Sequence, residues 1–512
     1  MRFHAEARRD RYDAIVVGSG IGGLTSAALL ARSGLDVLVI ERHDRVGGYG
    51  HSFRRGRYLF DSAVHLVGGC EPVAYEGGGL VHRLLSTLGV RDQVHFERID
   101  PCYEAVYPDL SLRVPCDLDG FVDAHAEEFP SEEKGLRQLV QECLNVRQET
   151  RRAADSHGGF DVSQIQSRFP TLLRYRRATL AQVLEEHIES PRLRALLGTL
   201  WPYLGLPPSR VSFVYFATML MSYVADGAYY CRGTFQRFAD ALAGAVCARG
   251  GEVLLRSSVR RIVVEGGRAC GVVLENGQRI AARCVISNAD ALQTIHELVG
   301  ADAFPAPYLA ALGRLKPSLS AFVAYLATDL PLDRDTTSHE TFYFPSWDHD
   351  AAYASSERGL PAWVSVTAPT LADPSLAPAG EQILMLTALV RYDALPWRDC
   401  KRAMTNTLVA IADRYIGGLE SHIRFREGAS PRTIERYTRN TNGALYGWEL
   451  SPRNVGAGRP ATQTPVDGLH LVGHWTQPGG GVYGVVTSGV QAARTILGHR
   501  RESELWDALA RA

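Results

Sequence analysis

Hydrophobic residues near the start of the chain follow a strand, turn, helix and strand pattern. An apolar run from Asp13 to Val17 leads into a glycine-rich turn, and an alanine- and leucine-rich stretch from about Gly22 to Arg32 has helical spacing. A second apolar run covers Asp36 to Ile40. This order predicts a βαβ unit. Apolar runs broken by glycines from Arg54 to Gly69 predict further short strands and loops.

Three later regions differ in their periodicity. Apolar residues at three- and four-residue spacing predict helices between about Asp117 and Gly227. Strand-like alternation from Gly251 to Ser287 is interrupted at Gly266-Gly267 and at Asn276-Gly277, the second of which is typical of a hairpin turn. Proline and aromatic residues are frequent from about Ala301 to Gly428, where we expect mixed structure.

The glycines of the first turn have a spacing with a clear physical purpose. Gly18, Gly20 and Gly23 fit G-x-G-x-x-G: the first permits the tight turn, the second lets a pyrophosphate approach, and the third lets helix and strand pack closely. Free N–H groups and the positive end of the helix dipole then face the phosphates. Glu41 ends the next strand, where its carboxylate can accept both hydroxyls of an adenosine ribose. The segment predicts a dinucleotide-binding site; a glycine-rich loop of an unrelated α/β protein is the alternative.

A second glycine cluster lies near the end of the sequence. Gly479, Gly481 and Gly484 repeat the same spacing, but HWTQP separates them from the preceding strand and no strand ending in an acid follows. The cluster therefore predicts the N-terminus of a helix near Gly481 rather than a second nucleotide site. The positive end of such a helix suits a flavin ring, whose pyrimidine side gains negative charge on reduction. A plain structural turn is the alternative.

Segments of cofactor-binding type thus stand at the start, in the middle and at the end of a chain of 512 residues, which is too long for one simple core. We expect an α/β protein with a discontinuous Rossmann-like cofactor domain, made of residues 10–90, 228–300 and 430–500. The intervening residues 91–227 and 301–429 are expected to form an inserted, mixed sheet and helical domain that binds the substrate.

Composition excludes some classes of function. The 55 Lys and Arg residues and 56 Asp and Glu residues leave a net charge of −1, which argues against a nucleic-acid binder that neutralises phosphates. Nine scattered cysteines contain no C-x-x-C pair, so we expect reduced thiols and a cytoplasmic protein. Residues 348–350 (DHD) have no partners at ligand spacing, which predicts a solvated turn and no metal site.

No segment predicts a membrane span or a signal peptide. The N-terminal residues MRFHAEARRDRYD are charged, with no apolar core after them. The run VSFVYFATMLMSYVA from Val211 is shorter than the roughly 18 residues that suggest a span. It predicts a buried helix or the wall of an apolar pocket. A peripheral contact with a membrane stays open, because a protein with a lipid-like substrate collects it from a bilayer.

Four segments together carry a family resemblance. They are GSGIGGLTSAALLARSGLDVLVIERHDRVGGYGHSF, FDSAVHLVGG, CRGTFQRFADALAGAVCARGGEVLLRSSVRRIVVEGGRACGVVLENG, and NGALYGWELSPRN with GLHLVGHWTQPGGGVYGVVTSG. In this order they resemble FAD-dependent oxidoreductases of the phytoene and carotenoid desaturase, carotenoid isomerase and retinol saturase type, within the amine-oxidase-like flavoproteins. The first segment contains the R-x-G-G motif of that family, and the second is similar to a signature of the retinol saturase branch.

The resemblance implies FAD as the cofactor and a set of cofactor-binding residues. They are Gly18, Gly20, Ile21, Gly22, Gly23, Glu41, Arg42, Arg45, Gly47, Gly48, Tyr49, His51, Ser52, Val259, Gly473, His474, Gly481 and Val482. Val259 would meet the adenine through its backbone, and Gly481 and Val482 would contact the isoalloxazine. Many relatives carry an acid at the position of His474. We therefore expect either that His474 contacts the ribityl chain of FAD or that it is a histidine packed inside the protein.

Two side chains are candidates for catalysis. His65 follows a strand-like run near the flavin-side segment, and histidine suits proton transfer near neutral pH. Tyr483 lies inside the flavin loop and is expected to face the substrate. Aromatic residues that either line a cavity or fill the core are Trp201, Tyr203, Phe213, Tyr215, Phe216, Tyr223, Tyr229 and Tyr230.

The leading hypothesis is an FAD-dependent oxidoreductase that acts on C–C or C=C bonds of a polyene, isoprenoid or related natural product, by desaturation, saturation or isomerisation. We expect a small apolar or carrier-bound substrate, held against the flavin in a dry tunnel, and an electron acceptor that the sequence does not identify. One alternative is oxidation of a C–N bond in an amine or amino-acid-derived substrate, because fold does not fix function. Another is a protein without catalysis that escorts prenylated proteins.

Overall fold

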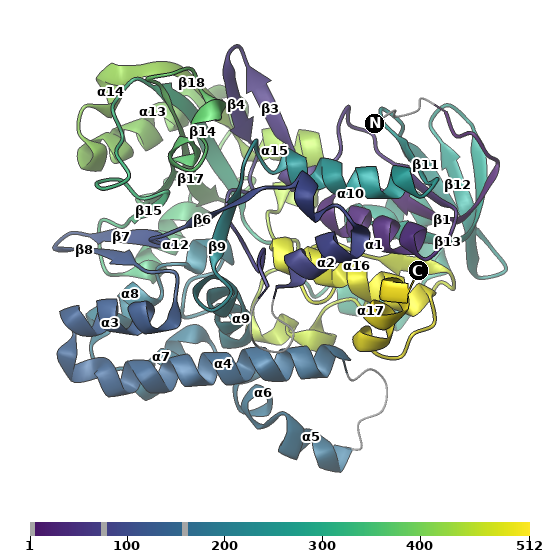
Figure 1. Cartoon of the computed structure of the whole chain (residues 1–512), viewed down its shortest axis with the longest axis horizontal. Coiled ribbons are helices and arrows are strands. Elements are labelled where there is room, and N and C mark those ends of the chain that lie inside the picture. The colour runs from purple at the N-terminus through teal and green to yellow at the C-terminus, as the bar shows by residue number, and fades with distance from the viewer. Residues whose placement is uncertain (1–5, 73–78, 156–161, 512) are drawn as a thin grey trace.

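The computed structural model describes residues 6–72, 79–155 and 162–511 and contains two large sheets, which lie at opposite ends of the molecule in Figure 1. The first sheet has the strand order β10-β2-β1-β13-β12-β11, with β19 paired to β13. Its strands are β1 (Arg11–Val17), β2 (Val37–Ile40), β10 (Glu252–Leu254), β11 (Val259–Glu265), β12 (Arg268–Leu274), β13 (Arg279–Ser287) and β19 (Leu469–Leu471). Strands β10, β2, β1, β13 and β19 are parallel, and β11 and β12 are antiparallel.

The predicted βαβ unit is confirmed, and helix α1 (Ile21–Arg32) joins β1 to β2. Nearly every residue of α1 is buried, because the helix packs against α10 (Gln236–Ala248) and α16 (Val482–Ile496) as well as the sheet. Its alanines and glycines permit this close approach on several sides. Strands from the start, middle and end of the sequence therefore share one sheet.

The second sheet is mostly antiparallel and has the order β18-β14-β17-β16-β15-β7-β8. Its strands are β7 (Tyr103–Tyr107), β8 (Leu110–Val114), β14 (Ser320–Thr328), β15 (Glu340–Tyr343), β16 (Val364–Thr367), β17 (Gln382–Val390) and β18 (Ile423–Ala429). The long strands β14 and β17 are apolar at successive positions, so both faces of the sheet centre are hydrophobic. One face packs on helix α13 (Trp397–Ile416).

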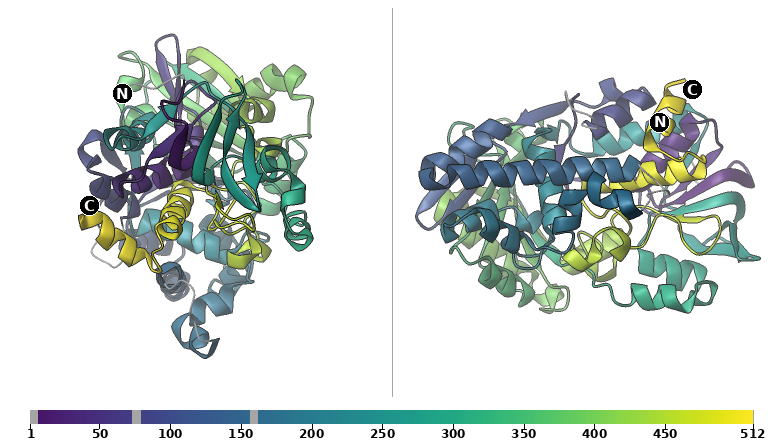
Figure 2. Two further views of the ribbon diagram at one scale, coloured as in Figure 1. Left: turned by 90° about the vertical axis from the view of Figure 1, so that its right-hand side faces the viewer. Right: turned by 90° about the horizontal axis from the view of Figure 1, so that it is seen from below.

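Helices dominate the region between the sheets and below them, as the spacing of apolar residues predicts. They are α3 (Leu118–Glu128), α4 (Glu133–Asp155), α5 (Val162–Arg168), α6 (Pro170–Tyr175), α7 (Leu180–His187), α8 (Pro191–Leu197) and α9 (Phe213–Val224). The long helix α4 runs along the underside of the molecule (Figures 1 and 2). Helix α9 is the run from Val211 that the sequence assigned to a buried helix or a pocket wall, and it is largely buried.

Shorter elements complete the molecule. They are the hairpin β3 (Ser52–Arg55) and β4 (Tyr58–Asp61); the three-stranded sheet of β5 (Val67–Gly68), β6 (Phe96–Ile99) and β9 (Ala228–Cys231); and helices α2 (Leu80–Leu88), α11 (Ala306–Leu312), α12 (His349–Glu357), α14 (Leu419–His422), α15 (Pro431–Thr438) and α17 (Glu502–Arg511). All nine cysteine thiols are unpaired. Within residues 6–72, 79–155 and 162–511, no helix has both the length and the apolar character needed to cross a membrane.

Residues 348–350 correct one prediction, because His349 is buried and does not lie in a solvated turn. Its Nδ1 accepts a hydrogen bond from the Trp201 indole at 3.0 Å, and its Nε2 lies 3.1 Å from the Tyr107 hydroxyl. Asp348 caps α12 by accepting from the Ala351 N–H at 2.9 Å. The described part of the chain holds no group of three or more His, Cys, Asp or Glu side chains suited to a metal ion.

Candidate cofactor and substrate site

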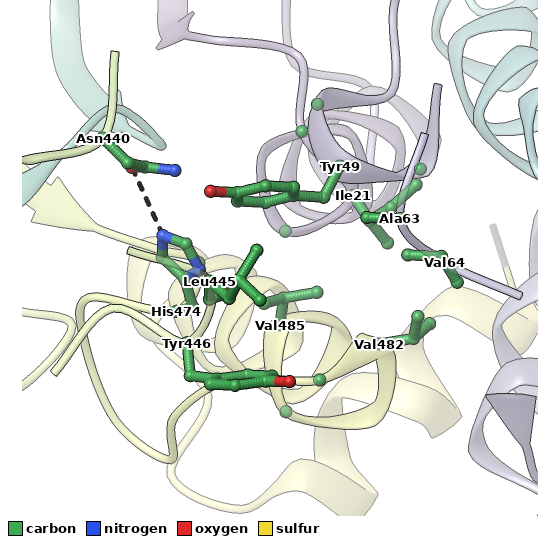
Figure 3. Close-up of a pocket in the computed structure, with 18 of the residues that line it drawn as sticks. Ile21, Tyr49, Ala63, Val64, Asn440, Leu445, Tyr446, His474, Val482 and Val485 are labelled. Carbon is green, nitrogen blue, oxygen red and sulfur yellow. Dashed lines mark hydrogen bonds between the residues drawn. The ribbon is translucent and has the colours of Figure 1, made fainter. Parts of the chain in front are cut away.

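One large cavity extends from the carboxyl ends of the parallel strands to the second sheet and has a volume of about 2640 Å³. Pockets for one drug-sized ligand measure roughly 300–1,000 Å³, so this cavity has room for a dinucleotide and a second molecule. Figure 3 shows part of it, with Tyr49, Ile21 and Val64 facing Leu445, Val485 and Tyr446.

The first glycine loop presents bare backbone to this cavity. Gly18 has a φ of +91°, and Gly20 is the N-cap of α1 with no side chain hydrogen-bonded to the helix end. A Cβ on Gly20 would lie 2.5 Å from the Asn288 side chain, and a Cβ on Gly23 would lie 2.5 Å from the Gly18 carbonyl oxygen. The positive φ of Gly18 and the backbone clash at Gly23 therefore require glycine, and Gly20 leaves the start of α1 on the cavity wall without a side chain.

Glu41 lies at the end of β2 on the cavity wall, as the motif predicts. Its Oε2 accepts hydrogen bonds from the Ser19 N–H at 2.8 Å and the Ser19 hydroxyl at 2.7 Å, and its Oε1 accepts from the His43 N–H at 2.8 Å. A carboxylate has about four acceptor sites, so one remains for a ribose hydroxyl. These bonds hold the carboxylate in place before any ligand binds.

Asn288 is a site residue that sequence reasoning missed. Its Oδ1 accepts a hydrogen bond from the Gly23 N–H at 2.9 Å, and the same atom lies 3.0 Å from where a Cβ on Gly473 would be. The side chain therefore bonds to the first glycine loop and also packs beside Gly473, which follows β19. Its position just after β13, next to β1, is the signal that could have found it, because ligands bind beyond the carboxyl ends of parallel strands.

The R-x-G-G segment is held by side chain to backbone contacts. Arg45 donates to the Ser52 carbonyl oxygen at 2.6 Å, and Tyr49 donates to the Ala444 carbonyl oxygen at 2.8 Å. The His51 ring has Nδ1 2.6 Å from the Gly48 carbonyl oxygen. Burial lowers the pKa of His51 to about 4, so the ring is neutral near pH 7.

The second glycine cluster begins a helix, as predicted. Gly481 is the N-cap of α16, no side chain caps it, and the first turn contains no acid. His474 is buried, with Nδ1 3.1 Å from the Leu445 carbonyl oxygen and Nε2 3.3 Å from Asn440 Oδ1, as Figure 3 shows for Asn440. Burial lowers the pKa of His474 to about 4. His474 also lies on the cavity wall, so a ribityl contact and a packed histidine both stay open.

Most of the other predicted cofactor residues lie on the wall of this same cavity. They are Gly18, Gly20, Ile21, Gly22, Arg42, Arg45, Gly47, Gly48, Tyr49, His51, Val259, Gly473, Gly481 and Val482. Gly23 and Ser52 do not line it and lie one layer behind the wall, so a direct contact of either with the cofactor stays a prediction. The Gly23 N–H is bonded to Asn288, and the Ser52 N–H donates to Gln236 Oε1 at 3.2 Å.

The far part of the cavity has an apolar wall. Alternate residues of the second sheet face it, while the residues between them pack on α13. The wall consists of Ala321, Val323, Tyr325, Phe342, Trp363, Ser365, Met385, Thr387 and Leu389 from the sheet region, with Val214, Tyr215, Thr218, Met219 and Tyr223 from α9. Several aromatic residues were predicted either to line a cavity or to fill the core. Of these, Tyr203, Tyr215 and Tyr223 line the cavity, and Trp201 and Phe213 are in the core.

His65 lies on the cavity wall beside a buried carboxyl group. Its Nε2 is 3.2 Å from Glu340 Oε2 and 3.4 Å from the Tyr203 hydroxyl, and its Nδ1 is 2.9 Å from the Ala63 carbonyl oxygen. Glu340 is completely buried and accepts from the Thr367 hydroxyl at 2.7 Å, while its Oε1 has no partner. This group was missed from the sequence, because nothing local marks Glu340 within the mixed region.

The protonation of this pair follows from its burial. Burial raises the pKa of Glu340 to about 8 and lowers the pKa of His65 to about 4. Near neutral pH the pair therefore holds one proton on the carboxyl group, which donates to the neutral imidazole. Tyr203, whose pKa is also raised by burial, keeps its hydroxyl proton.

Tyr483 lies in the first turn of α16, and its hydroxyl accepts from Arg151 Nε at 3.3 Å. Arg147 and Arg151 both bond to Asp226, so this hydroxyl belongs to a charged cluster between α4 and α9. Tyr483 also lines the cavity, and its role toward the substrate stays a prediction.

The residues present fit FAD. Two helix N-termini without a capping side chain face one cavity, a Cβ on Gly23 would clash with the Gly18 carbonyl oxygen, and an acid stands at the end of β2. This is the arrangement that receives the two ends of an adenine–isoalloxazine dinucleotide, so fold and site define a flavoprotein of the dinucleotide-binding class. The chain belongs to the flavin-containing amine oxidoreductase family, whose model matches residues 21–497. It is an FAD-dependent oxidoreductase, as predicted.

Three curated proteins illustrate its similarity to known sequences. Prolycopene isomerase 2, chloroplastic, of an Oncidium hybrid cultivar is 27% identical over 98% of this chain and 86% of its own length. The 4,4'-diapolycopene oxygenase of a Methylomonas species is 26% identical over 94% of this chain and 97% of its own length. The all-trans-retinol 13,14-reductase of Rattus norvegicus is 26% identical over 91% of this chain and 82% of its own length. A solved putrescine oxidase structure shares the fold, with a TM-score of 0.64 at 18% identity over 96% of this chain and 99% of its own.

Proposed function

We propose that this protein changes the C–C or C=C bonds of a long, apolar polyene or isoprenoid substrate with the help of FAD. The observation that supports this most is the shared cavity: the apolar face of the second sheet and the two glycine loops line one continuous space. A substrate held along that sheet face has one part next to the flavin. The similar isomerase, oxygenase and reductase, named for prolycopene, diapolycopene and retinol, support the same class of substrate.

The chain's own residues position the substrate and exclude water. Val323, Met385 and Leu389 offer an apolar surface without hydrogen-bond donors, so an extended hydrocarbon gains by leaving water and lies flat against the sheet. FAD, when bound, supplies the exchange of electrons with carbon. The His65–Glu340 pair stores a proton at the cavity wall, where desaturation must dispose of one and saturation must obtain one.

The test uses the yellow holoprotein without oxygen. Oxidised protein is mixed with polyenes, amines and carrier-bound substrates, photoreduced protein is mixed with the same panel, and flavin absorbance and product mass are recorded. Loss of two hydrogens indicates desaturation, gain of two indicates saturation, and an unchanged mass with a shifted retention time indicates isomerisation. Reaction with amines alone would replace the proposal by C–N oxidation, and a folded protein that takes up no flavin would favour the escort alternative.

A matched pair of variants tests the substrate wall itself. Thr387→Trp places a large side chain on the cavity face of β17, and Leu360→Trp adds the same side chain at a position that is 62% exposed. We expect the first to slow turnover of long polyenes by at least about tenfold with FAD content unchanged, since it removes space that the substrate occupies. The second should leave turnover as it is. Equal turnover in both variants would mean that the substrate binds elsewhere.

We extend the proposal to substrate uptake. Because a long apolar molecule partitions into bilayers, we propose a transient peripheral contact of a cytoplasmic protein with a membrane. Sedimentation with phosphatidylcholine vesicles that contain the polyene, compared with vesicles without it, measures this contact.

We also propose that the electron acceptor is a diffusible compound such as oxygen or a quinone. The rate at which each compound reoxidises the reduced protein in a stopped-flow experiment distinguishes them.

A further inference from the structure

Arg459 is a buried arginine behind the second glycine loop, and it does not line the cavity. Only 3% of its surface is exposed. Its guanidinium donates to the carbonyl oxygens of His474 at 2.6 Å, Trp448 at 3.2 Å and Thr476 at 3.4 Å. The side chain thus connects Trp448 to the segment that leads into the loop, and all three acceptors are neutral backbone groups.

No carboxylate balances this charge in the described part of the chain. Burial lowers the pKa of Arg459, and the hydroxyl of Tyr215 raises it. No Asp or Glu side chain among the described residues affects this pKa. The positive charge of Arg459 acts on neighbouring groups, because it contributes to the lowered pKa of His474. A buried cation without an anion is costly, and a negative charge that forms nearby is stabilised by it.

The position of Arg459 indicates where that negative charge arrives. Its guanidinium carbon lies 3.6 Å from where a Cβ on Gly479 would be, so only the loop backbone separates it from the cavity. The cavity wall includes Gln477, Pro478, Gly480 and Gly481 of the same loop. A single layer of peptide does little to screen a charge in a region of low dielectric constant.

A second source of positive potential meets the first at this place. The loop ends at Gly481, the N-cap of the 15-residue helix α16, which has neither a capping side chain nor an acid in its first turn. The positive end of that helix is therefore also uncompensated, and it faces the same part of the cavity. Neither feature depends on the other, because one is a side chain from residue 459 and the other is backbone.

We propose that Arg459 and the N-terminus of α16 together stabilise the negative charge that FAD gains on reduction, so that the protein binds reduced FAD more tightly than oxidised FAD. Arg459 acts through the loop and is a positioning and charge-stabilising residue, without contact to the reacting atoms. The inference rests on FAD binding and not on the identity of the substrate. A protein tuned in this way holds its flavin at a higher reduction potential than a protein that binds both forms of FAD equally.

The test measures the reduction potential of the bound flavin by equilibration with a reference dye, with no substrate present. Two variants separate charge from packing: Arg459→Gln removes the cation, and Arg459→Lys keeps it while losing the forked geometry. We expect Arg459→Gln to lower the potential and to weaken the preference for reduced FAD by on the order of tenfold. Arg459→Lys should keep most of the preference. Equal shifts in both variants, or an unchanged potential in Arg459→Gln, would overturn the inference.

Two further variants keep the test decisive if Arg459→Gln does not fold or loses FAD. Tyr215→Glu adds a carboxylate next to Arg459 and leaves all three backbone bonds in place, and we expect it to lower the potential as well. Arg494→Gln alters another buried arginine, whose charge is opposed by Glu502 and Asp155, and should leave the potential unchanged. An unaltered potential in Tyr215→Glu contradicts the proposal. Since no substrate is used, failure here is distinct from failure of the polyene hypothesis.

Discussion

Replacing Glu340 with glutamine should change how stability depends on pH. Glu340 has no exposed surface, and its only basic neighbour among the described residues is the neutral His65 ring 3.2 Å away, so burial raises its pKa from 4.5 to about 8. Between these two values the folded chain binds a proton that the unfolded chain has lost. The free energy of unfolding therefore falls as pH rises through this window.

The magnitude follows from the width of the window. Each pH unit within it costs about 1.4 kcal/mol, so wild-type protein loses about 3 kcal/mol from this group between about pH 5.5 and about pH 7.5. Glutamine has a similar shape and keeps an N–H donor for His65, but it does not titrate. His65 contributes with the opposite sign, because its pKa is lowered to about 4 and stability is lost as pH falls below its unfolded value. That contribution is common to both proteins.

The assay is urea denaturation of both holoproteins, saturated with FAD, at several pH values across this range. The unfolding free energy of Glu340→Gln relative to wild type should increase by about 3 kcal/mol from the lowest to the highest pH, since all other groups cancel in the difference. A constant difference would show that Glu340 titrates normally. A difference that decreases with rising pH would show that the folded chain binds fewer protons here than the unfolded chain, which would refute the assignment of a stored proton.

Three other substitutions test the site. Gly23→Ala brings a Cβ within 2.5 Å of the Gly18 carbonyl oxygen, so it should destabilise the protein by about 1–3 kcal/mol and lower its FAD content, measured by the ratio of flavin to protein absorbance. Gly313→Ala is the control, because its Cβ would meet the nearest atom at 3.5 Å. Glu41→Gln should weaken FAD binding by on the order of tenfold in fluorescence titrations of apoprotein; unchanged affinity would remove Glu41 from the ribose site. His65→Ala should slow substrate turnover on the order of a hundredfold with FAD content intact, and wild-type turnover and flavin reduction rates would exclude proton transfer by His65.

Elements with local signals could be predicted from the sequence to within one or two residues. The βαβ unit, the turn at Asn276-Gly277 between β12 and β13, and the start of α16 after Gly481 each depend on neighbouring residues alone. Gly277 has a φ of +88°, the conformation for which the asparagine-glycine pair is typical. The boundaries of the two domains, at residues 90, 228, 300 and 430, stay a prediction.

Features that depend on distant segments could not be predicted. Glu340 matters because β15 and β16 place it beside Thr367 and because the chain brings it to His65, more than two hundred residues earlier. The residues DHD (348–350) predicted a solvated turn, but Trp201 and Tyr107 from other segments form hydrogen bonds to the buried His349. A pattern read along the chain contains no information about such neighbours, which only tertiary packing supplies.

The position of Asn288 between Gly23 and Gly473 has a consequence for biosynthesis. Gly23 and Gly473 stand at opposite ends of the polypeptide, and the cavity between them closes only after α16 has packed on α1. A ribosome must therefore release almost the entire chain before the vitamin-derived cofactor finds a complete pocket. Cells short of riboflavin would accumulate a finished polypeptide with an open, water-filled centre, and this form should be the one that proteases remove first.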